Sequence, residues 1–331
     1  MELVIVNGAS NISRSVVRGL TSGGAYRKVR LLDFRPFKSS VYAFQREMAE
    51  QGIEVEKHQA NSGSSLDMAL EGADKVVYFT HNYTSMTSCK NNFLVGTSKL
   101  AKKHGVSSLT AVCPVEHDMV YNEHMTKSWI ELRRESEQQA LAANDKLTIL
   151  NTDLVYGSDP THMIHYMAQS VLAGKIPSEF FFTDEANFNP LHHSDLTRAV
   201  AHAMENPHHD QFSVRGEEKI SIKDLLGLIE QSCEKEQGST KAQLRIPLLK
   251  LSEMFEEFFV GITHDRNMRL LLQHLEEYPT DCPCPGTDFW EASGLQREHS
   301  LLKFFKGHRY SDQDDRMATP TFGNYKMVDL N

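Results

Sequence analysis

VNGASNIS, residues 6–13, joins the first apolar run of the chain to a stretch of apolar residues at helical spacing. A strand, a tight glycine turn and a helix in this order are typical of a loop that binds the phosphates of a dinucleotide. Gly8 occupies the position of the first glycine. The middle glycine of the usual loop is deleted, and the last is replaced by Ser13.

This altered loop keeps several groups that bind phosphate. Ser10 and Asn11 can form hydrogen bonds with an anion, and so can the backbone amides around Ile12 at the start of the helix. A shorter loop, however, moves those amides relative to the ligand. Two interpretations stay open: a retained nucleotide site, or an intact turn without a ligand.

The first 157 residues alternate between apolar, β-rich runs and stretches of helical spacing. The runs predict strands at residues 3–6, 29–32, 53–55, 75–79, 108–113 and 147–150. The stretches between them predict helices at residues 13–20, 41–50, 66–70, 93–104 and 128–143. Such alternation is typical of parallel βαβ units, and it predicts an α/β fold with a doubly wound parallel (Rossmann) sheet.

After residue 157 the alternation becomes irregular. Residues 158–245 predict a smaller α/β lobe with helices near 163–173, 194–204 and 221–236 and a strand near 180–182. Residues 246–331 predict a C-terminal helical segment with a partly acidic surface, then an extended polar tail that docks a partner. The predicted domains are therefore a nucleotide-binding core at 1–157, the lobe at 158–245 and the tail segment at 246–331.

The composition excludes several classes of partner. A net charge of −9 provides no basic surface for nucleic acid. No apolar run approaches the length of about 18 residues that spans a bilayer, so any membrane association is expected to be peripheral. Five cysteines in 331 residues favour a reducing compartment over a disulfide framework. Cys282-Pro283-Cys284 lacks the spacing of a zinc site, and no metal is predicted.

Two charged residues follow the second predicted strand. Asp33 can accept hydrogen bonds from an adenosine ribose, which favours NAD, whereas Arg35 can pair with the 2′-phosphate of NADP. Both can also be solvated loop charges. Thr80, which follows the fourth predicted strand, completes the candidate residues at this edge of the sheet.

The predicted helix at 128–143 lacks the acid–base pair of a short-chain dehydrogenase. No tyrosine in the chain is followed four residues later by lysine. In the register of that Tyr-x-x-x-Lys pair, Trp129 replaces the tyrosine and Arg133 replaces the lysine. An indole cannot release a proton near neutral pH, although Arg133 keeps a positive charge where the lysine would hold the ribose. The sequence therefore predicts no catalytic residues.

These segments together resemble the atypical extended short-chain dehydrogenase superfamily. The resemblance covers roughly residues 2–230 and lies in VNGASNIS, LLD at 31–33, GADKVV at 72–77, LVYG at 154–157 and NPLHHSDL at 189–196. It implies a Rossmann fold that binds NAD(P).

The C-terminal region resembles one branch of that superfamily, the accessory dehydrogenase-like subunit of mitochondrial respiratory complex I. The similar parts are ITHD at 262–265, residues 301–310 and the polar extension after them. Members of the branch lack a standard catalytic triad and hold a structural NADPH on the matrix arm. The resemblance implies a non-catalytic accessory subunit on the matrix side of the inner mitochondrial membrane. It also implies other respiratory subunits as partners and a structural NADP(H) or NAD(H).

Two other functions stay open. A redox-sensing NAD(P)-binding regulator would use nucleotide occupancy to change its affinity for a partner. An atypical NAD(P)-dependent oxidoreductase would need a substitute proton donor, such as Tyr156 or His81.

Several conspicuous side chains have simpler explanations. The pair His192-His193 suggests a metal, but a helix N-terminus capped near Ser194 explains it better. Phe289 and Trp290 either anchor a partner or pack the C-terminal segment onto its own domain.

Overall fold

A computed structural model gives the structure of the chain. It describes residues 1–33, 37, 39–59, 63–80, 93–114, 126–157, 164, 167–168, 187–233 and 286–307. The sequence predictions for residues 163–173 and 180–182 fall largely outside these ranges. Those for residues 248–260, for Cys282 and Cys284, and for the polar tail fall wholly outside them.

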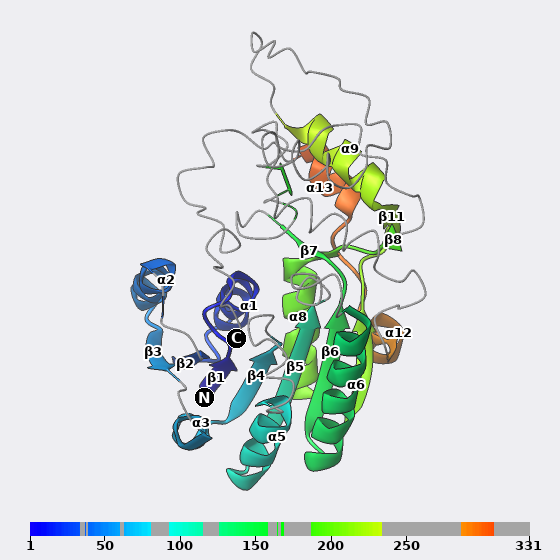
Figure 1. Ribbon diagram of the computed structural model, residues 1–331. Helices are drawn as coiled ribbons and strands as arrows, with labels where there is room; N and C mark the ends of the chain where they lie inside the picture. Colours follow the sequence, from blue (N-terminus) through cyan, green and yellow to red (C-terminus); the bar gives the residue numbers. More distant parts are fainter. Residues whose placement is uncertain are drawn as a thin grey trace, which may run out of the picture.

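The core is an eight-stranded parallel sheet with strand order β12-β10-β6-β5-β4-β1-β2-β3 (Figure 1). Its strands are β1 (Glu2–Val6), β2 (Lys28–Asp33), β3 (Glu54–Gln59), β4 (Lys75–Phe79), β5 (Ser108–Pro114), β6 (Leu147–Thr152), β10 (Asp210–Val214) and β12 (Thr287–Asp288). The part 3-2-1-4-5-6 of this order is that of a doubly wound dinucleotide-binding sheet. The predicted fold class is confirmed.

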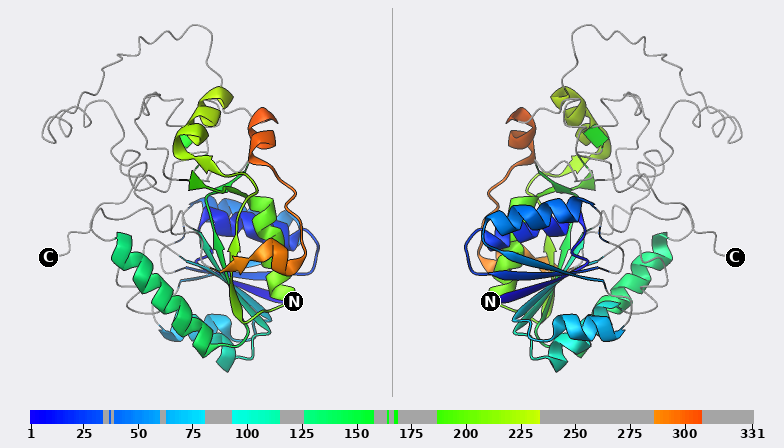
Figure 2. Two further views of the ribbon diagram at one scale, coloured as in Figure 1. Left: turned by 90° about the vertical axis from the view of Figure 1, so that its right-hand side faces the viewer. Right: turned by 90° about the vertical axis from the view of Figure 1, so that its left-hand side faces the viewer.

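Helices cover both faces of the sheet, because its central strands are apolar on both sides (Figure 2). One face carries α1 (Asn11–Thr21), α2 (Ser39–Glu50), α8 (His193–Glu205) and α12 (Phe289–Ser293). The other carries α3 (Gly63–Leu70), α5 (Phe93–Lys103) and α6 (Thr126–Ala143). Along β1, Leu3 and Ile5 pack toward the first face, and Val4 and Val6 toward the second. This alternation follows from the period-2 geometry of a strand.

Two helices approach each other closely behind the sheet. A Cβ atom at Gly19 of α1 would lie 2.5 Å from Cγ2 of Thr197 on α8. Glycine at this position therefore allows the backbone of α1 to contact the Thr197 side chain of α8. Since α1 carries the loop at its N-terminus, this contact helps to fix the orientation of the loop.

All the strands and helices predicted for residues 1–157 are present, with shifts of a few residues at their ends. The strand predicted at residues 75–79 has those bounds in β4, whereas the strand predicted at 53–55 is β3, Glu54–Gln59. The later segments also contribute to the same sheet. β10 comes from the predicted lobe at 158–245, and β12 comes from the predicted tail segment at 246–331.

Residues 286–307, the described part of the C-terminal segment, pack against the core. Phe289 and Trp290 are 1% and 4% exposed, and Phe289 contacts Phe212 of β10 edge to face. The indole N–H of Trp290 donates to the carbonyl of Arg215 at 2.9 Å. Of the two alternatives left open for these aromatic residues, the structure has packing onto their own domain.

Short elements lie beyond the carboxyl ends of β5 and β6 (Figure 1). They are β7 (Val155–Tyr156), β8 (Asn187–Phe188), β9 (Leu191–His192), β11 (Ile220–Ser221), α9 (Ile222–Ser232) and α13 (Leu301–Gly307). The helix N-terminus predicted near Ser194 is confirmed, and its cap is His192, whose Nδ1 accepts a hydrogen bond from the Ser194 amide. Among the described helices, none combines the length and the apolar character needed to cross a membrane.

Candidate nucleotide site

The loop after β1 has an unusual backbone conformation. Asn7 has φ 60°, the only positive φ at a described residue other than glycine. Such a conformation costs a residue with a side chain about 1 kcal/mol or more, and it persists where neighbouring groups fix it. Here the Asn7 side-chain amide donates to the carbonyl of Phe79 at the end of β4. The turn is therefore fastened to the adjacent strand.

Gly8 is required by packing around the turn. A Cβ atom there would lie 3.0 Å from Cδ2 of Leu31 and 3.1 Å from the carbonyl oxygen of Ile5. The amide of Gly8 donates to the carbonyl of Leu32 at 3.0 Å. The glycine thus lets β1 turn directly over β2, which is the first role that the sequence pattern assigns to it.

Ser10 caps α1, so its hydroxyl is already engaged. It accepts from the amide of Ser13 at 3.1 Å and donates to the hydroxyl of Ser13 at 2.9 Å. The Ser13 hydroxyl in turn donates to the Ser10 carbonyl at 2.7 Å. The serine in place of the last glycine therefore closes a capping arrangement on the helix. An anion at this helix would meet the N-terminal amides more directly than the two hydroxyls.

Asp33 faces the loop. It is fully buried, and its Oδ2 accepts the amide of Ala9 at 3.1 Å. This bond ties the end of β2 to the turn between Gly8 and Ser10. The bond to the loop is a role that the sequence did not indicate.

Of the other residues predicted to lie at the nucleotide site, the structure describes some and not others. Thr80 follows β4, where its amide donates to the carbonyl of Val112 at 2.9 Å and its hydroxyl to the same oxygen at 3.4 Å. Ile12 is 5% exposed on α1. Asn11 begins α1, but its side chain lies outside the described part. Arg35 and His81 also lie outside the described residues.

A basic residue that sequence reasoning missed lies beside the loop. Arg14, in the first turn of α1, is 6% exposed and donates from Nη1 to the hydroxyl of Ser40 at 2.8 Å. It links the start of α1 to the start of α2 and places a positive charge between them. The signal available in the sequence was a basic residue in the first turn of the helix that follows the glycine.

The Arg133 side chain is largely buried and is bonded to other side chains of the protein. Its Nε lies 2.7 Å from Oε1 of Glu137, and its Nη2 donates to Oδ1 of Asn151 on β6 at 2.7 Å. Glu137 is 1% exposed, and its other oxygen accepts from Gln211 of β10 at 2.8 Å. The guanidinium therefore joins α6 to two strands of the sheet. These contacts are within the protein, and the contact of Arg133 with a nucleotide stays a prediction.

The substitute proton donor proposed on β7 is poorly suited to that task. Tyr156 is 1% exposed, and its hydroxyl has no hydrogen-bond partner among the described residues. Burial raises the pKa of Tyr156 well above its ordinary value, and the charges of Glu218 and Asp195 raise it further. A phenol of this kind does not release a proton near neutral pH. The catalytic serine of a short-chain dehydrogenase would fall at Cys113 or Pro114, and Cys113 is fully buried near the end of β5.

The described residues fit one end of a dinucleotide better than the other. The turn at Gly8, the N-terminus of α1 and the Arg14 guanidinium form a suitable setting for phosphate. Asp33 and Arg133, the two residues expected to bind ribose, are instead engaged with the protein itself. A bound nucleotide would thus be held by its phosphates and by loop amides, without a described acid–base group beside it.

Asp153, at the carboxyl end of β6, is a buried acid whose titration is measurable. Burial raises the pKa of Asp153 from 3.8 to about 6, although the amides of Leu154 and Asn189 donate to its oxygens, each at 2.8 Å. Because the folded-state pKa is raised, its stabilising contribution is fully present below pH 3.8 and is lost as the pH rises through about 6. The shift corresponds to about 3 kcal/mol.

We expect Asp153→Asn to remove this pH dependence. The unfolding free energy of the variant minus that of the wild type should become more positive by about 2.5 kcal/mol between pH 4 and pH 7. Urea denaturation at several pH values measures this difference, and any cost of asparagine that does not depend on pH cancels in the comparison. Parallel curves for the two proteins would contradict the raised pKa.

Known structures share this architecture at low sequence identity. The chain matches the triphenylmethane reductase of Citrobacter sp. complexed with NADP(H), with a TM-score of 0.62 and 13% identity, over 92% of this chain and 99% of that one. It matches a nucleoside-diphosphate-sugar epimerase from Pseudomonas aeruginosa with a TM-score of 0.57 and 12% identity, over 92% and 95%. The chain has the extended short-chain dehydrogenase fold.

A third match has the same fold over a smaller share of the chain. The dTDP-glucose 4,6-dehydratase DesIV of Streptomyces venezuelae, a double mutant with NAD bound, has a TM-score of 0.56 and 19% identity. It covers 70% of this chain and 81% of its own length. No protein-family model and no curated protein matches the sequence. At these identities the extended short-chain dehydrogenase fold is what the structures have in common.

Proposed function

We propose that this chain is a non-catalytic accessory subunit of mitochondrial NADH:ubiquinone oxidoreductase. In this role the extended short-chain dehydrogenase fold serves structure and assembly, and it holds NAD(P)H without turning it over. The subunit lies on the matrix side of the inner membrane, bound to other subunits of the complex. The resemblance of residues 262–265 and 301–310 to the accessory subunit supports this assignment.

The observation that carries the non-catalytic role is the state of Arg133. A catalytic lysine at this position would need to reach a ribose and lower the pKa of a tyrosine one helical turn before it. Instead, the Arg133 side chain is 12% exposed and paired with Glu137, and position 129 holds tryptophan. Neither residue supplies a titratable proton, and the described residues offer no replacement beside the loop.

The same geometry supports a nucleotide that is held but not consumed. When bound, NAD(P)H could supply a hydride, but a carbonyl acceptor also needs a proton donor. The Gly8 loop and the Arg14 guanidinium would hold and orient the phosphates of the nucleotide, and no described residue beside them would donate a proton to the carbonyl. A fixed nucleotide of this kind stabilises the fold by mass action, because it binds only the folded chain.

The test uses the full chain with an affinity tag in the cells that produce it. We expect the tagged chain to co-purify with a large assembly that oxidises NADH with ubiquinone. Native mass spectrometry should find about one NAD(P)H for each copy. A free monomer that oxidises NAD(P)H when a carbonyl substrate is added would overturn the proposal. A nucleotide that exchanges freely and alters partner binding would instead indicate the redox-sensing regulator.

Restoring the missing pair should not restore catalysis. We expect Trp129→Tyr with Arg133→Lys to show no carbonyl-dependent NADPH oxidation above the background without protein. The reason is that the loop stays shortened and Glu137 stays available to capture the new lysine. The wild type and each single variant are the controls. Turnover by the double variant would mean that only these two side chains separate the protein from an active dehydrogenase.

A further inference from the structure

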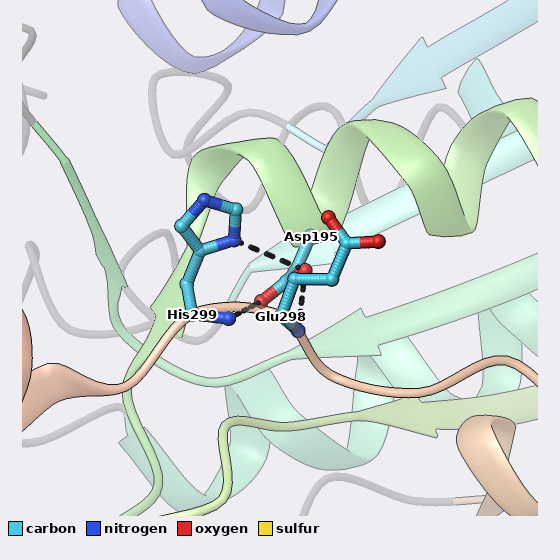
Figure 3. A group of neighbouring side chains, drawn as sticks. All are labelled: Asp195, Glu298 and His299. Carbon is cyan, nitrogen blue, oxygen red and sulfur yellow. Dashed lines mark hydrogen bonds and ion pairs between the residues drawn. The ribbon is translucent and has the colours of Figure 1, made fainter.

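Residues 296–301, here called the strap, cross the N-terminus of α8 and connect α12 to α13. Buried or half-buried carboxylates hold the strap by its backbone. Asp195 of α8 is 1% exposed and accepts the amides of Glu298 at 3.2 Å and His299 at 3.1 Å (Figure 3). Glu218 accepts the amide of Leu301 at 3.2 Å and also the hydroxyl of Ser300. The strap is therefore fastened at both ends.

The charges around Asp195 form a closed ion-pair group. By distance alone, Asp195, Glu298 and His299 could surround a cation. However, the Arg198 guanidinium lies 3.1 Å from Asp195 and 2.9 Å from Glu298, and it also donates to the carbonyl of Gln296. A metal ion would have to displace this resident positive charge. The group thus acts as a fastening for the strap.

Imidazole rings also hold the strap against the start of α8. The rings of His192 and His299 are stacked, with centroids 4.0 Å apart and planes inclined by 12°. The ring of His193 also lies close to that of His192, with centroids 4.5 Å apart, and His193 Nδ1 is 3.0 Å from the hydroxyl of Ser15 on α1. The stack therefore joins the strap to α8, and through Ser15 to the helix that carries the loop.

His192 must be neutral in this arrangement. Its Nδ1 accepts the amide of Ser194 at 3.2 Å, and a nitrogen that accepts a hydrogen bond carries no proton. Protonation would make Nδ1 a donor that faces the donor N–H of Ser194, so the hydrogen bond that caps α8 would be lost. It would also place a cation at the positive end of the helix dipole and against a second imidazole.

Charged and titratable groups surround the stack. Among the described residues they are Tyr156 on β7, His193, Asp195 and Arg198 on α8, and Glu218, Glu298 and His299. His299 Nδ1 lies 3.3 Å from Oδ1 of Asp195, and the Arg198 guanidinium lies 3.1 Å from the same oxygen. A proton on His192 would lie against the stacked imidazole of His299 and would remove the cap of α8.

We propose that the His192–His299 stack is an acid-sensitive latch that holds the strap on α8 and releases it when His192 is protonated. The folded, closed arrangement binds fewer protons than the open one. Its stability therefore decreases as the pH decreases through the range in which a free imidazole titrates, about 6.5. One pH unit below that value, opening is favoured about tenfold. This inference does not depend on the proposed subunit role.

The test is hydrogen exchange of the full chain at pH 7.5 and pH 5.5, corrected for the intrinsic effect of pH on exchange. We expect the protection of the strap amides of Glu298, His299 and Leu301 to decrease about tenfold at pH 5.5. The amides of β4 should keep their protection. Ordinary carboxylates stay ionised in this range. Asp153 does titrate within it, and the variants below retain that residue.

His192→Asn is the decisive variant, because asparagine caps helices well and does not titrate. We expect it to keep the strap protected at both pH values. His208→Asn replaces an exposed imidazole away from the strap and should retain the wild-type response. The latch is excluded if the wild-type strap keeps its protection at pH 5.5, or if His192→Asn loses as much as the wild type. If His192→Asn fails to fold, the wild type alone tests the latch. Loss of protection in the strap without loss in β4 supports it, because global unfolding would expose both.

Discussion

Arg133→Ala is expected to lower the free energy of unfolding by about 3–5 kcal/mol, because it leaves a buried carboxylate without its cation. Glu137 is 1% exposed, and after the substitution only Gln211 would remain as its described side-chain partner. Asn151 would lose its bond from the guanidinium as well. Urea denaturation of the purified chain, with and without nucleotide, measures the effect.

Arg134→Ala is the matched control, since Arg134 is the next residue of α6 and is exposed. A surface substitution of this kind should change stability by about 0.5 kcal/mol or less. If Arg133→Ala instead left stability unchanged and weakened nucleotide binding more than tenfold, the main role of the guanidinium would be to bind the nucleotide. The internal ion pair would then not be its principal role.

Phe289→Ala is expected to cost about 3–5 kcal/mol, the usual penalty for removing a buried aromatic side chain. Phe289 is 1% exposed between Phe212, His202 and Trp290. The substitution would leave a cavity between the sheet and α12 that these rings cannot close by small shifts. The midpoint and slope of a urea denaturation curve measure the loss.

Leu302→Ala provides the comparison in the same segment. Leu302 is 46% exposed on α13, so its truncation should cost less than about 1 kcal/mol. Equal and small effects of the two substitutions would mean that residues 286–307 are not part of the folded core. They would then have to be regarded as a separate docking element.

The main sheet was predictable because its strands are continuous apolar runs. Parallel strands buried on both faces need such runs, and the helices between them need one apolar side. Residues 75–79 illustrate this, since the run itself gives the bounds of β4. β12 had no such signal. Its residues are Thr287 and Asp288, which carry no alternation, and only the aromatic pair after them fixes its place at the edge of the sheet.

The sequence predicted where the candidate site lies, but it did not predict which side chains contact one another there. The Gly8 turn and the start of α1 follow from local geometry, which a short stretch of sequence specifies. The bonds from Asp33 to Ala9 and from Arg133 to Asn151 depend on how distant strands align. The N-terminus of α8 was predicted near Ser194, but that its capping group is the imidazole of His192 could not be read from the sequence.

The place of β12 in the sheet has a consequence for synthesis on the ribosome. β10 ends at residue 214, but the strand that covers its outer edge begins only at Thr287. Until that point has been translated, β10 presents unpaired backbone groups, and the cavity for Phe289 and Trp290 is empty. Chaperones would therefore have to shield a nearly finished nascent chain, and a premature stop codon before residue 287 would yield an aggregation-prone product.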